Sequence, residues 1–173
     1  MVGKGLMAGL RAPEPLNPSH KVDGFDCGEP QLNEWLRQRA WQNQVSGASR
    51  TYVSADAQGV VGAYYALASS AVAPTKASGR FRRNMPDPIP VVVLGRLAIA
   101  APFQGQGLGR ALFQDAARRV VQAADAIGIR GLLVHAVSDP AVAFYRALGL
   151  EPSPLEPLTL MVTVADLRAA MDA

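Results

Sequence analysis

The chain has 173 residues, the length of one domain with a sizeable core. Hydrophobic residues make up 49% and charged residues 18%, as in globular proteins, and no apolar run reaches the length of a membrane span. Cys27 is the single cysteine, which excludes an internal disulfide and a cysteine metal cluster, and the formal net charge is +3. We therefore expect one cytoplasmic domain over residues 1–173, with residues 1–11 poorly ordered and no metal site.

The patterns of the first half of the chain predict, in order, an edge strand at 16–22, a helix at 29–44, two strands of a hairpin at 49–56 and 60–72, and a loop at 75–90. Pro30 suits the first turn of the helix, and the dipeptide Gln58-Gly59 suits the hairpin turn. Three prolines between positions 86 and 90 oppose a helix in the loop, because proline lacks the N–H group and restricts the residue before it.

The second half predicts a strand near 91–100, a helix near 107–127, a strand at 129–137, a helix at 139–150, a strand at 158–164 and a helix at 165–172. The long helix has an apolar stripe opposite a polar one; the two sets are Leu108, Leu112, Ala116, Val120 and Ile127, and Arg110, Gln114, Arg118 and Gln122. The continuous apolar run at 129–137 indicates a strand covered on both faces. This order of strands and helices predicts an α/β domain with a mixed sheet.

A glycine-rich turn, "QGQGLGR" at 104–110, separates the strand from the long helix. The phosphate loop of nucleotide hydrolases needs a lysine there, and no lysine follows Lys76. The dinucleotide fingerprint needs glycine in place of Arg110 and an acidic residue after a following strand, whereas Asp125 lies within the helix. What remains is Gln-x-x-Gly-x-Gly, whose N–H groups at a helix start can hold a pyrophosphate. A turn without a ligand is the alternative.

Four other residues of the second half each allow two interpretations. Gly95 interrupts a strand, either as a bulge that splays the strand or as a packing glycine. Tyr145 is either a residue of the crevice that holds the glycine turn or a core aromatic. Arg96, a charge within an apolar strand, must be paired or functional. His135 is expected to be a satisfied core histidine rather than a catalyst.

The segments "RLAIAAPFQGQGLGRALF" and "LLVHAVSDPAVAFYRALGL" resemble the GCN5-related N-acetyltransferase (GNAT) family. Together with "WLRQRAWQNQ", "VVGAYYALAS" and "RRNMPDPIPVVVLGRLA", they make the chain similar, roughly over residues 12–164, to toxin acetyltransferases (TacT-like) of bacterial toxin–antitoxin modules. Those enzymes acetylate the α-amino group of aminoacyl-tRNA and inhibit translation. The resemblance implies a GNAT fold, with a mixed central sheet splayed between its fourth and fifth strands and flanked by helices.

The resemblance also implies the site and the partners. Acetyl-CoA would transfer its acetyl group directly to the amine, with Tyr145 as proton donor to the departing thiolate. The residues expected to bind acetyl-CoA, including strand N–H groups that stabilise the oxyanion, are Leu97, Ala98, Ile99, Gln104, Gly105, Gln106, Gly107, Leu108, Gly109, Arg110 and Phe144. The residues expected to bind tRNA are Arg80, Arg82 and Arg83, with a merely solvated charged face as the alternative. A ribbon-helix-helix antitoxin and a homodimer are further implications.

The strand before the glycine turn, "VVVLGRLAIAA", contains no acid that could act as a general base. An α-amine, with a pKa of about 7.7–8.0, needs less help to lose its proton than lysine at about 10.4. The missing acid therefore favours an α-amine substrate, although a base from elsewhere is not excluded. Two rival functions stay open: acetylation of a protein N-terminus or a small amine, and a non-catalytic CoA-binding regulatory module.

Overall fold

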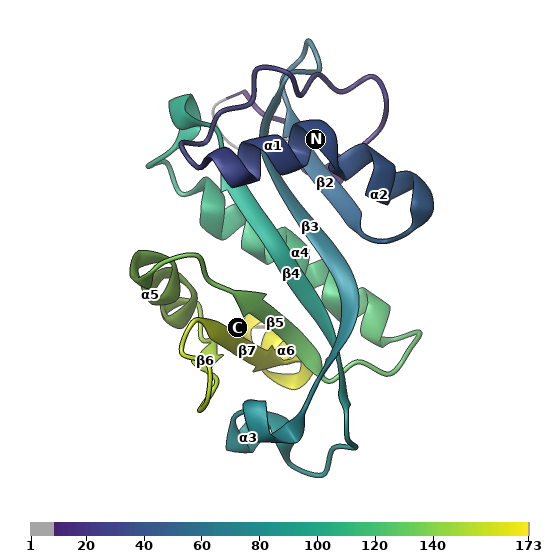
Figure 1. Cartoon of the computed structure of the whole chain (residues 1–173), viewed down its shortest axis with the longest axis vertical. Helices are drawn as coiled ribbons and strands as arrows, with labels where there is room; N and C mark the ends of the chain where they lie inside the picture. The colour runs from purple at the N-terminus through teal and green to yellow at the C-terminus, as the bar shows by residue number, and fades with distance from the viewer. Residues whose placement is uncertain (1–8, 173) are drawn as a thin grey trace. The chain divides into compact units, whose positions relative to one another are not determined.

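The structure is a computed structural model that describes residues 9–172, and its chain divides into two compact units (Figure 1). Unit 1 contains residues 9–68 together with Arg96–Asp115, and unit 2 contains Ser69–Gly95 and residues 116–172. Of the segment expected to be poorly ordered, residues 1–8 lie outside the described residues, whereas Leu10 is buried. No helix within residues 9–172 is long and apolar enough to cross a membrane.

The elements in chain order are β1 (Glu14–Pro15), α1 (Pro30–Gln38), α2 (Ala40–Ser46), β2 (Arg50–Ala55), β3 (Val61–Val72), η1 (Pro74–Lys76), α3 (Gly79–Arg82), β4 (Ile89–Ile99), η2 (Ala101–Phe103), α4 (Leu108–Ala124), β5 (Gly131–His135), α5 (Asp139–Ala147), β6 (Glu151–Pro152), β7 (Thr159–Thr163) and α6 (Val164–Asp172). The strands pair in the order β1-β2-β3-β4-β5-β7-β6. The predicted α/β class with a mixed sheet is confirmed, since β4 and β5 are parallel and β2 and β3 antiparallel.

In unit 1, two neighbouring tyrosines of β3 point to opposite faces of the strand, as the strand repeat requires. Tyr64 is fully buried and its hydroxyl donates to the carbonyl of Leu32 in α1 at 2.7 Å. Tyr65 is also fully buried, and its hydroxyl donates to Oδ2 of Asp115 in α4 at 2.5 Å. Helix α1 therefore covers one face of β3 and the first turns of α4 cover the other.

In unit 2, β5 is the central strand. It pairs in parallel with β4, from the Val91–Gly131 pair to the Leu94–Val134 pair, and antiparallel with β7. The residues of β5 up to Val134 are buried, which confirms the expectation of a strand covered on both faces. The buried cluster beside it joins Phe81 of α3 with residues of β4, β5 and β7.

Two predictions for the first half of the chain are wrong in detail. Residues 16–22 do not form the edge strand, because Asn17 makes a turn in which its Oδ1 accepts from the N–H of Ser19 at 2.9 Å; the edge strand is β1 instead. The single helix expected at 29–44 is two helices, because the backbone leaves helical geometry at Arg39 (φ −120°, ψ −30°).

Three further differences concern unit 2. The segment 75–90, expected to be a loop, contains the end of η1 and the short helix α3, which begins after Ser78 and ends before the prolines. Strand β6 was not predicted, since two residues carry no periodic signal. Ile127 was placed on the apolar stripe of the long helix, but α4 ends at Ala124 and Ile127 is exposed; the rest of the predicted stripe is buried.

Candidate active site

The glycine turn connects the end of η2 to the start of α4 in unit 1. Gly105 and Gly107 have φ angles of +78° and +81°, a left-handed backbone conformation that side chains strain. Both glycines are exposed. The turn therefore depends on glycine for its backbone path and keeps its surface free of side chains at those two positions.

The main-chain N–H groups of residues 105–110 donate to no acceptor within the described part of the chain. Ala111 is the first residue after the turn whose N–H is bonded, to the carbonyl of Gly107 at 3.3 Å. Because α4 is 17 residues long, its unpaired N–H groups carry the positive end of a helix dipole. A row of free N–H groups at such a helix start is a binding site for a phosphate or diphosphate.

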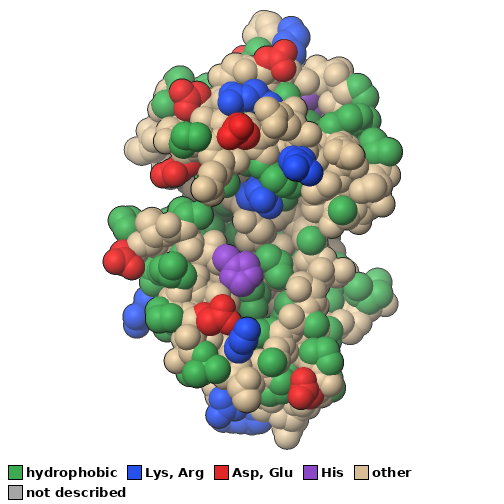
Figure 2. All heavy atoms as spheres, in the orientation of Figure 1, with side chains coloured by type: hydrophobic (Ala, Val, Ile, Leu, Met, Phe, Trp, Pro, Cys, Tyr) green, Lys and Arg blue, Asp and Glu red, His purple; other side chains and the backbone are tan. Residues whose placement is uncertain are grey.

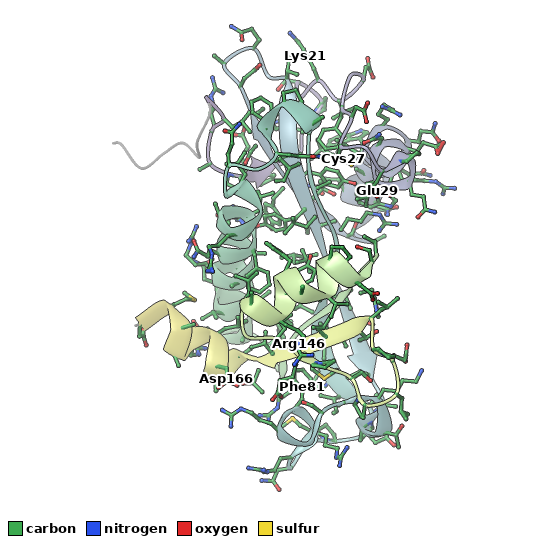
Figure 3. All side chains as sticks on the ribbon, turned by 90° about the vertical axis from the view of Figure 1, so that its left-hand side faces the viewer. Lys21, Cys27, Glu29, Phe81, Arg146 and Asp166 are labelled. Atoms are coloured by element: carbon green, nitrogen blue, oxygen red, sulfur yellow. The ribbon has the colours of Figure 1, made fainter. Side chains whose placement is uncertain are left out.

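Gln104, the first residue of the motif, is held by protein carbonyls. Its Nε2 donates to the carbonyl of Cys27 and to that of Ile99, both at 2.8 Å. Figure 3 shows Cys27 close to Glu29, which precedes α1. The Gln104 amide thus anchors the turn, and the groups that the turn leaves free are the N–H groups that follow it.

Strand β4 contains the residues that we predicted to face the acyl group. The pairing of β4 with β5 ends at Leu94, whereas β4 itself continues to Ile99. A Cβ atom built on Gly95 would meet no atom within 4 Å, so the alternative of a packing glycine has no support. Ala98 is buried, and Leu97 and Ile99 are half-buried.

Tyr145 and Phe144 lie on α5 in unit 2, a helix capped by Ser138, whose hydroxyl accepts from the N–H of Ala141. Burial raises the pKa of Tyr145 to about 12, so its phenol keeps its proton at neutral pH. The half-buried Phe144 ring packs edge-to-face on that of Tyr145, with the centroids 5.0 Å apart. At neutral pH Tyr145 is therefore a neutral, protonated phenol.

The three arginines predicted to bind tRNA have different surroundings in unit 2. Arg80 makes a bidentate ion pair with Asp166 of α6 at 2.7 and 2.6 Å, and Figure 3 labels Asp166. Arg82 donates to the carbonyl of Ala77 at 3.2 Å, and Arg83 is exposed and has no partner among residues 9–172. Arg80 and Arg83 also line a common hollow of about 240 Å³. Figure 2 shows basic side chains in several separate groups on the visible face.

Two residues have surroundings that the sequence did not reveal. The guanidinium carbon of Arg96 lies 4.3 Å from the centroid of the Trp35 ring, so an aromatic face is its partner within unit 1. His135, expected in the core, is exposed, and its Nδ1 lies 3.0 Å from Oγ1 of Thr159. The sequence signal for the contact of Arg96 with Trp35 was the position of Arg96 within an apolar strand. The contact of His135 with Thr159 had no sequence signal.

Comparisons with known proteins show the family of the chain. Residues 47–152 match the family model of the acetyltransferase (GNAT) domain. The chain is 50% identical over 163 residues to a tRNA-acetylating toxin of Mycobacterium tuberculosis (strain ATCC 25618 / H37Rv), and the match covers 94% of this chain and 98% of that protein.

Solved structures of the toxin AtaT are also similar to the chain. AtaT complexed with acetyl-methionyl-tRNAfMet has a TM-score of 0.85 and 30% identity, over 92% of this chain and 98% of AtaT. A tyrosine-to-phenylalanine mutant of AtaT, bound to the C-terminus of the antitoxin AtaR and to acetyl-CoA, has a TM-score of 0.80 and 29% identity, over 94% and 98% of the two chains. A family match over more than half of the sequence, and a half-identical relative of nearly full coverage, lead to one conclusion: the chain belongs to the GNAT acetyltransferase family.

Proposed function

We propose that the protein is an acetyl-CoA-dependent N-acetyltransferase that acetylates the α-amino group of aminoacyl-tRNA and so inhibits translation in the cytoplasm. The observation that carries the proposal is the row of free N–H groups over residues 105–110, in a chain half-identical to a tRNA-acetylating toxin. The N–H groups offer a site for the diphosphate of acetyl-CoA, and the relative supports the choice of acceptor.

In this proposal the glycine turn binds the diphosphate, and the N–H groups near Leu97, Ala98 and Ile99 stabilise the oxyanion that forms on the thioester carbonyl. The amine nitrogen bonds to the carbonyl carbon, and the bond from that carbon to sulfur breaks. Tyr145 donates its phenolic proton to the departing thiolate, a role that requires the protonated phenol present at neutral pH. The acceptor reacts as the neutral α-amine, which is partly populated near pH 7. Its nitrogen loses a proton to water as the amide forms, and water returns a proton to the Tyr145 phenolate.

The proposed RNA contacts are Arg82 and Arg83, with Arg80 as a residue whose charge is largely neutralised by Asp166. We also propose that a second copy of the chain forms a homodimer with it, and that an antitoxin of the ribbon-helix-helix class blocks the enzyme. The support for the antitoxin is the AtaT structure that contains the C-terminus of AtaR.

The test is mass spectrometry of a total charged-tRNA pool incubated with the protein and acetyl-CoA. We expect N-acetylated aminoacyl-tRNA, and we expect Tyr145→Phe to lower kcat by about 10²- to 10⁴-fold while acetyl-CoA binding stays intact. Turnover of peptide N-termini or small amines equal to that of charged tRNA would favour the rival acetyltransferase. Binding of acetyl-CoA with no thiol release in any charged-tRNA pool would favour the non-catalytic module.

A further inference from the structure

Arg96 is held at the end of an aromatic stack in unit 1. Its guanidinium lies over the Trp35 ring, and that ring stacks on Tyr64 with centroids 6.0 Å apart and an interplanar angle of 9°. Tyr64 is in turn fixed by complete burial and by the hydrogen bond from its hydroxyl to Leu32. The stack therefore gives the planar guanidinium a defined orientation before any ligand binds.

The hydrogen-bonding groups of Arg96 are unused. Within residues 9–172 its five N–H donors have neither an ion pair nor a hydrogen bond. Two other arginines of the same unit differ, because Arg37 donates to the carbonyl of Phe25 at 2.8 Å and Arg50 to that of Gln44 at 2.7 Å. Arg96 is also half-buried, and burying a charge without an opposite charge costs free energy. An anionic partner from outside the chain is what this side chain lacks.

The face of β4 that carries Arg96 distinguishes between two possible anions. Ala98 and Ala100 pack in the same buried cluster as residues of α1, and the strand repeat puts Arg96 on their side. Helix α4 contacts the opposite face of the neighbouring strand β3, through Tyr65. The body of α4, whose start is the proposed site of the acetyl-CoA diphosphate, therefore packs on the face opposite to Arg96. The other phosphate-bearing substrate is the tRNA.

We infer that Arg96 is an RNA-binding residue of the acceptor site, whose guanidinium, positioned on Trp35, forks onto a backbone phosphate of aminoacyl-tRNA. The inference rests on the proposed function, because it takes charged tRNA as the substrate. It assigns to Trp35 a positioning role and predicts a phosphate contact outside the arginines of residues 80–83.

The test compares Arg96→Gln and Arg96→Lys with Arg11→Gln, a matched control that removes one exposed charge from the same unit. Each variant is assayed with charged tRNA and with a phosphate-free aminoacyl nucleoside as acceptor, over a series of salt concentrations. For Arg96→Gln we expect about a tenfold or larger rise in KM for charged tRNA, a salt slope of log KM that is smaller by about one, and unchanged use of the nucleoside. Arg96→Lys keeps the charge without the fork and should give an intermediate KM.

For Arg96→Gln, an equal rise in KM with both acceptors would overturn the inference. A KM for charged tRNA equal to that of Arg11→Gln would overturn it as well. A fall in acetyl-CoA affinity in Arg96→Gln would also overturn it, because the phosphate would then belong to the coenzyme. Assays run below the unfolding transition of every variant, with Arg96→Lys as the variant that preserves charge. If wild-type protein acetylates no charged tRNA, the proposed function fails. Arg96 is then judged by equilibrium tRNA binding, where an unchanged salt slope in Arg96→Gln refutes its role.

Discussion

The side-chain amide of Gln104 donates both of its hydrogens to main-chain carbonyls, one to Cys27 and one to Ile99. These bonds connect the glycine turn to the segment before α1 and to the last residue of β4. The role of the glutamine in the motif is therefore to fix the backbone path of the turn. The glycines keep the exposed surface of the turn free of side chains. The N–H groups that we propose to bind the diphosphate follow directly after this fixed residue.

Replacing Gln104 by Met should weaken acetyl-CoA binding about tenfold, because methionine matches the length of the side chain but donates to neither carbonyl. The loss is that expected for about 1.4 kcal/mol of lost preorganisation, within the usual range for hydrogen bonds. Isothermal titration with CoA measures it. Gln106→Met is the control, since its Nε2 makes one long bond of 3.4 Å to the carbonyl of Pro102, and it should cause the smaller loss. A larger loss in the control would contradict this role of Gln104.

The stability of the protein should fall at alkaline pH, more steeply than in a variant without the buried Tyr145 phenol. Burial raises the pKa of Tyr145 to about 12, whereas an unfolded tyrosine titrates near pH 10. The stabilisation is therefore complete below about pH 10 and is lost as the pH rises toward 12, by at most about 1.4 kcal/mol per pH unit for one group. Burial also raises the pKa of Tyr64, so two tyrosines contribute.

Urea unfolding of wild type and Tyr145→Phe between pH 8 and pH 11.5 measures this dependence. The difference in free energy of unfolding between the two proteins should be constant up to about pH 9.5. It should shrink above that pH, because phenylalanine has no proton to lose. A Tyr52→Phe variant, altered at a half-buried tyrosine of β2, serves as the comparison for loss of a hydroxyl alone. Parallel curves for wild type and Tyr145→Phe up to pH 11.5 would argue against a raised pKa.

The turn, the long helix and the parallel strand could be predicted because each has a strong local signal. Glycines at 105 and 107 indicate a left-handed backbone, and the alternation of apolar residues in α4 indicates its buried face. The break at Arg39 and the two-residue strand β6 could not be predicted, because a single non-helical residue and a two-residue strand leave no periodic pattern. The type of an element could thus be predicted where the local sequence and the tertiary packing favour the same secondary structure.

The candidate site also has features that the sequence predicts and features that it does not. The motif predicts where the N–H groups lie, but the sequence cannot show that the Gln104 side chain bonds to Cys27, since that contact joins distant segments. Arg80 and Arg83 looked equivalent as members of one basic run. The difference between them comes from Asp166, which tertiary packing brings to Arg80 alone. Charge is visible in a sequence, and its neutralisation by a distant partner is not.

Arg83 should contribute more to tRNA binding than Arg80, because Asp166 pairs with the charge of Arg80 while that of Arg83 has no partner among residues 9–172. Arg83→Gln should reduce the salt slope of log Kd for tRNA by about one, and Arg80→Gln should reduce it by less. Asp166→Asn frees Arg80 and should make the subsequent Arg80→Gln change as large as that of Arg83→Gln. Filter binding over a salt series measures wild type and all four variants, and equal slopes for the two single arginine variants would refute the distinction.

Gly131, the first residue of β5, should tolerate no larger side chain. A Cβ atom at this position would lie 2.1 Å from the carbonyl oxygen of Val162 and 2.9 Å from Cα of Thr163, and backbone atoms of a paired strand cannot move aside as a flexible side chain can. Gly131→Ala should therefore destabilise the protein by about 3 kcal/mol, the upper range for overpacking. Gly128→Ala is the matched control, three residues earlier, where an added Cβ meets nothing within 4 Å. Urea unfolding of both variants measures the loss of stability. A similar loss in each would contradict the explanation that the close approach of β7 requires glycine at position 131.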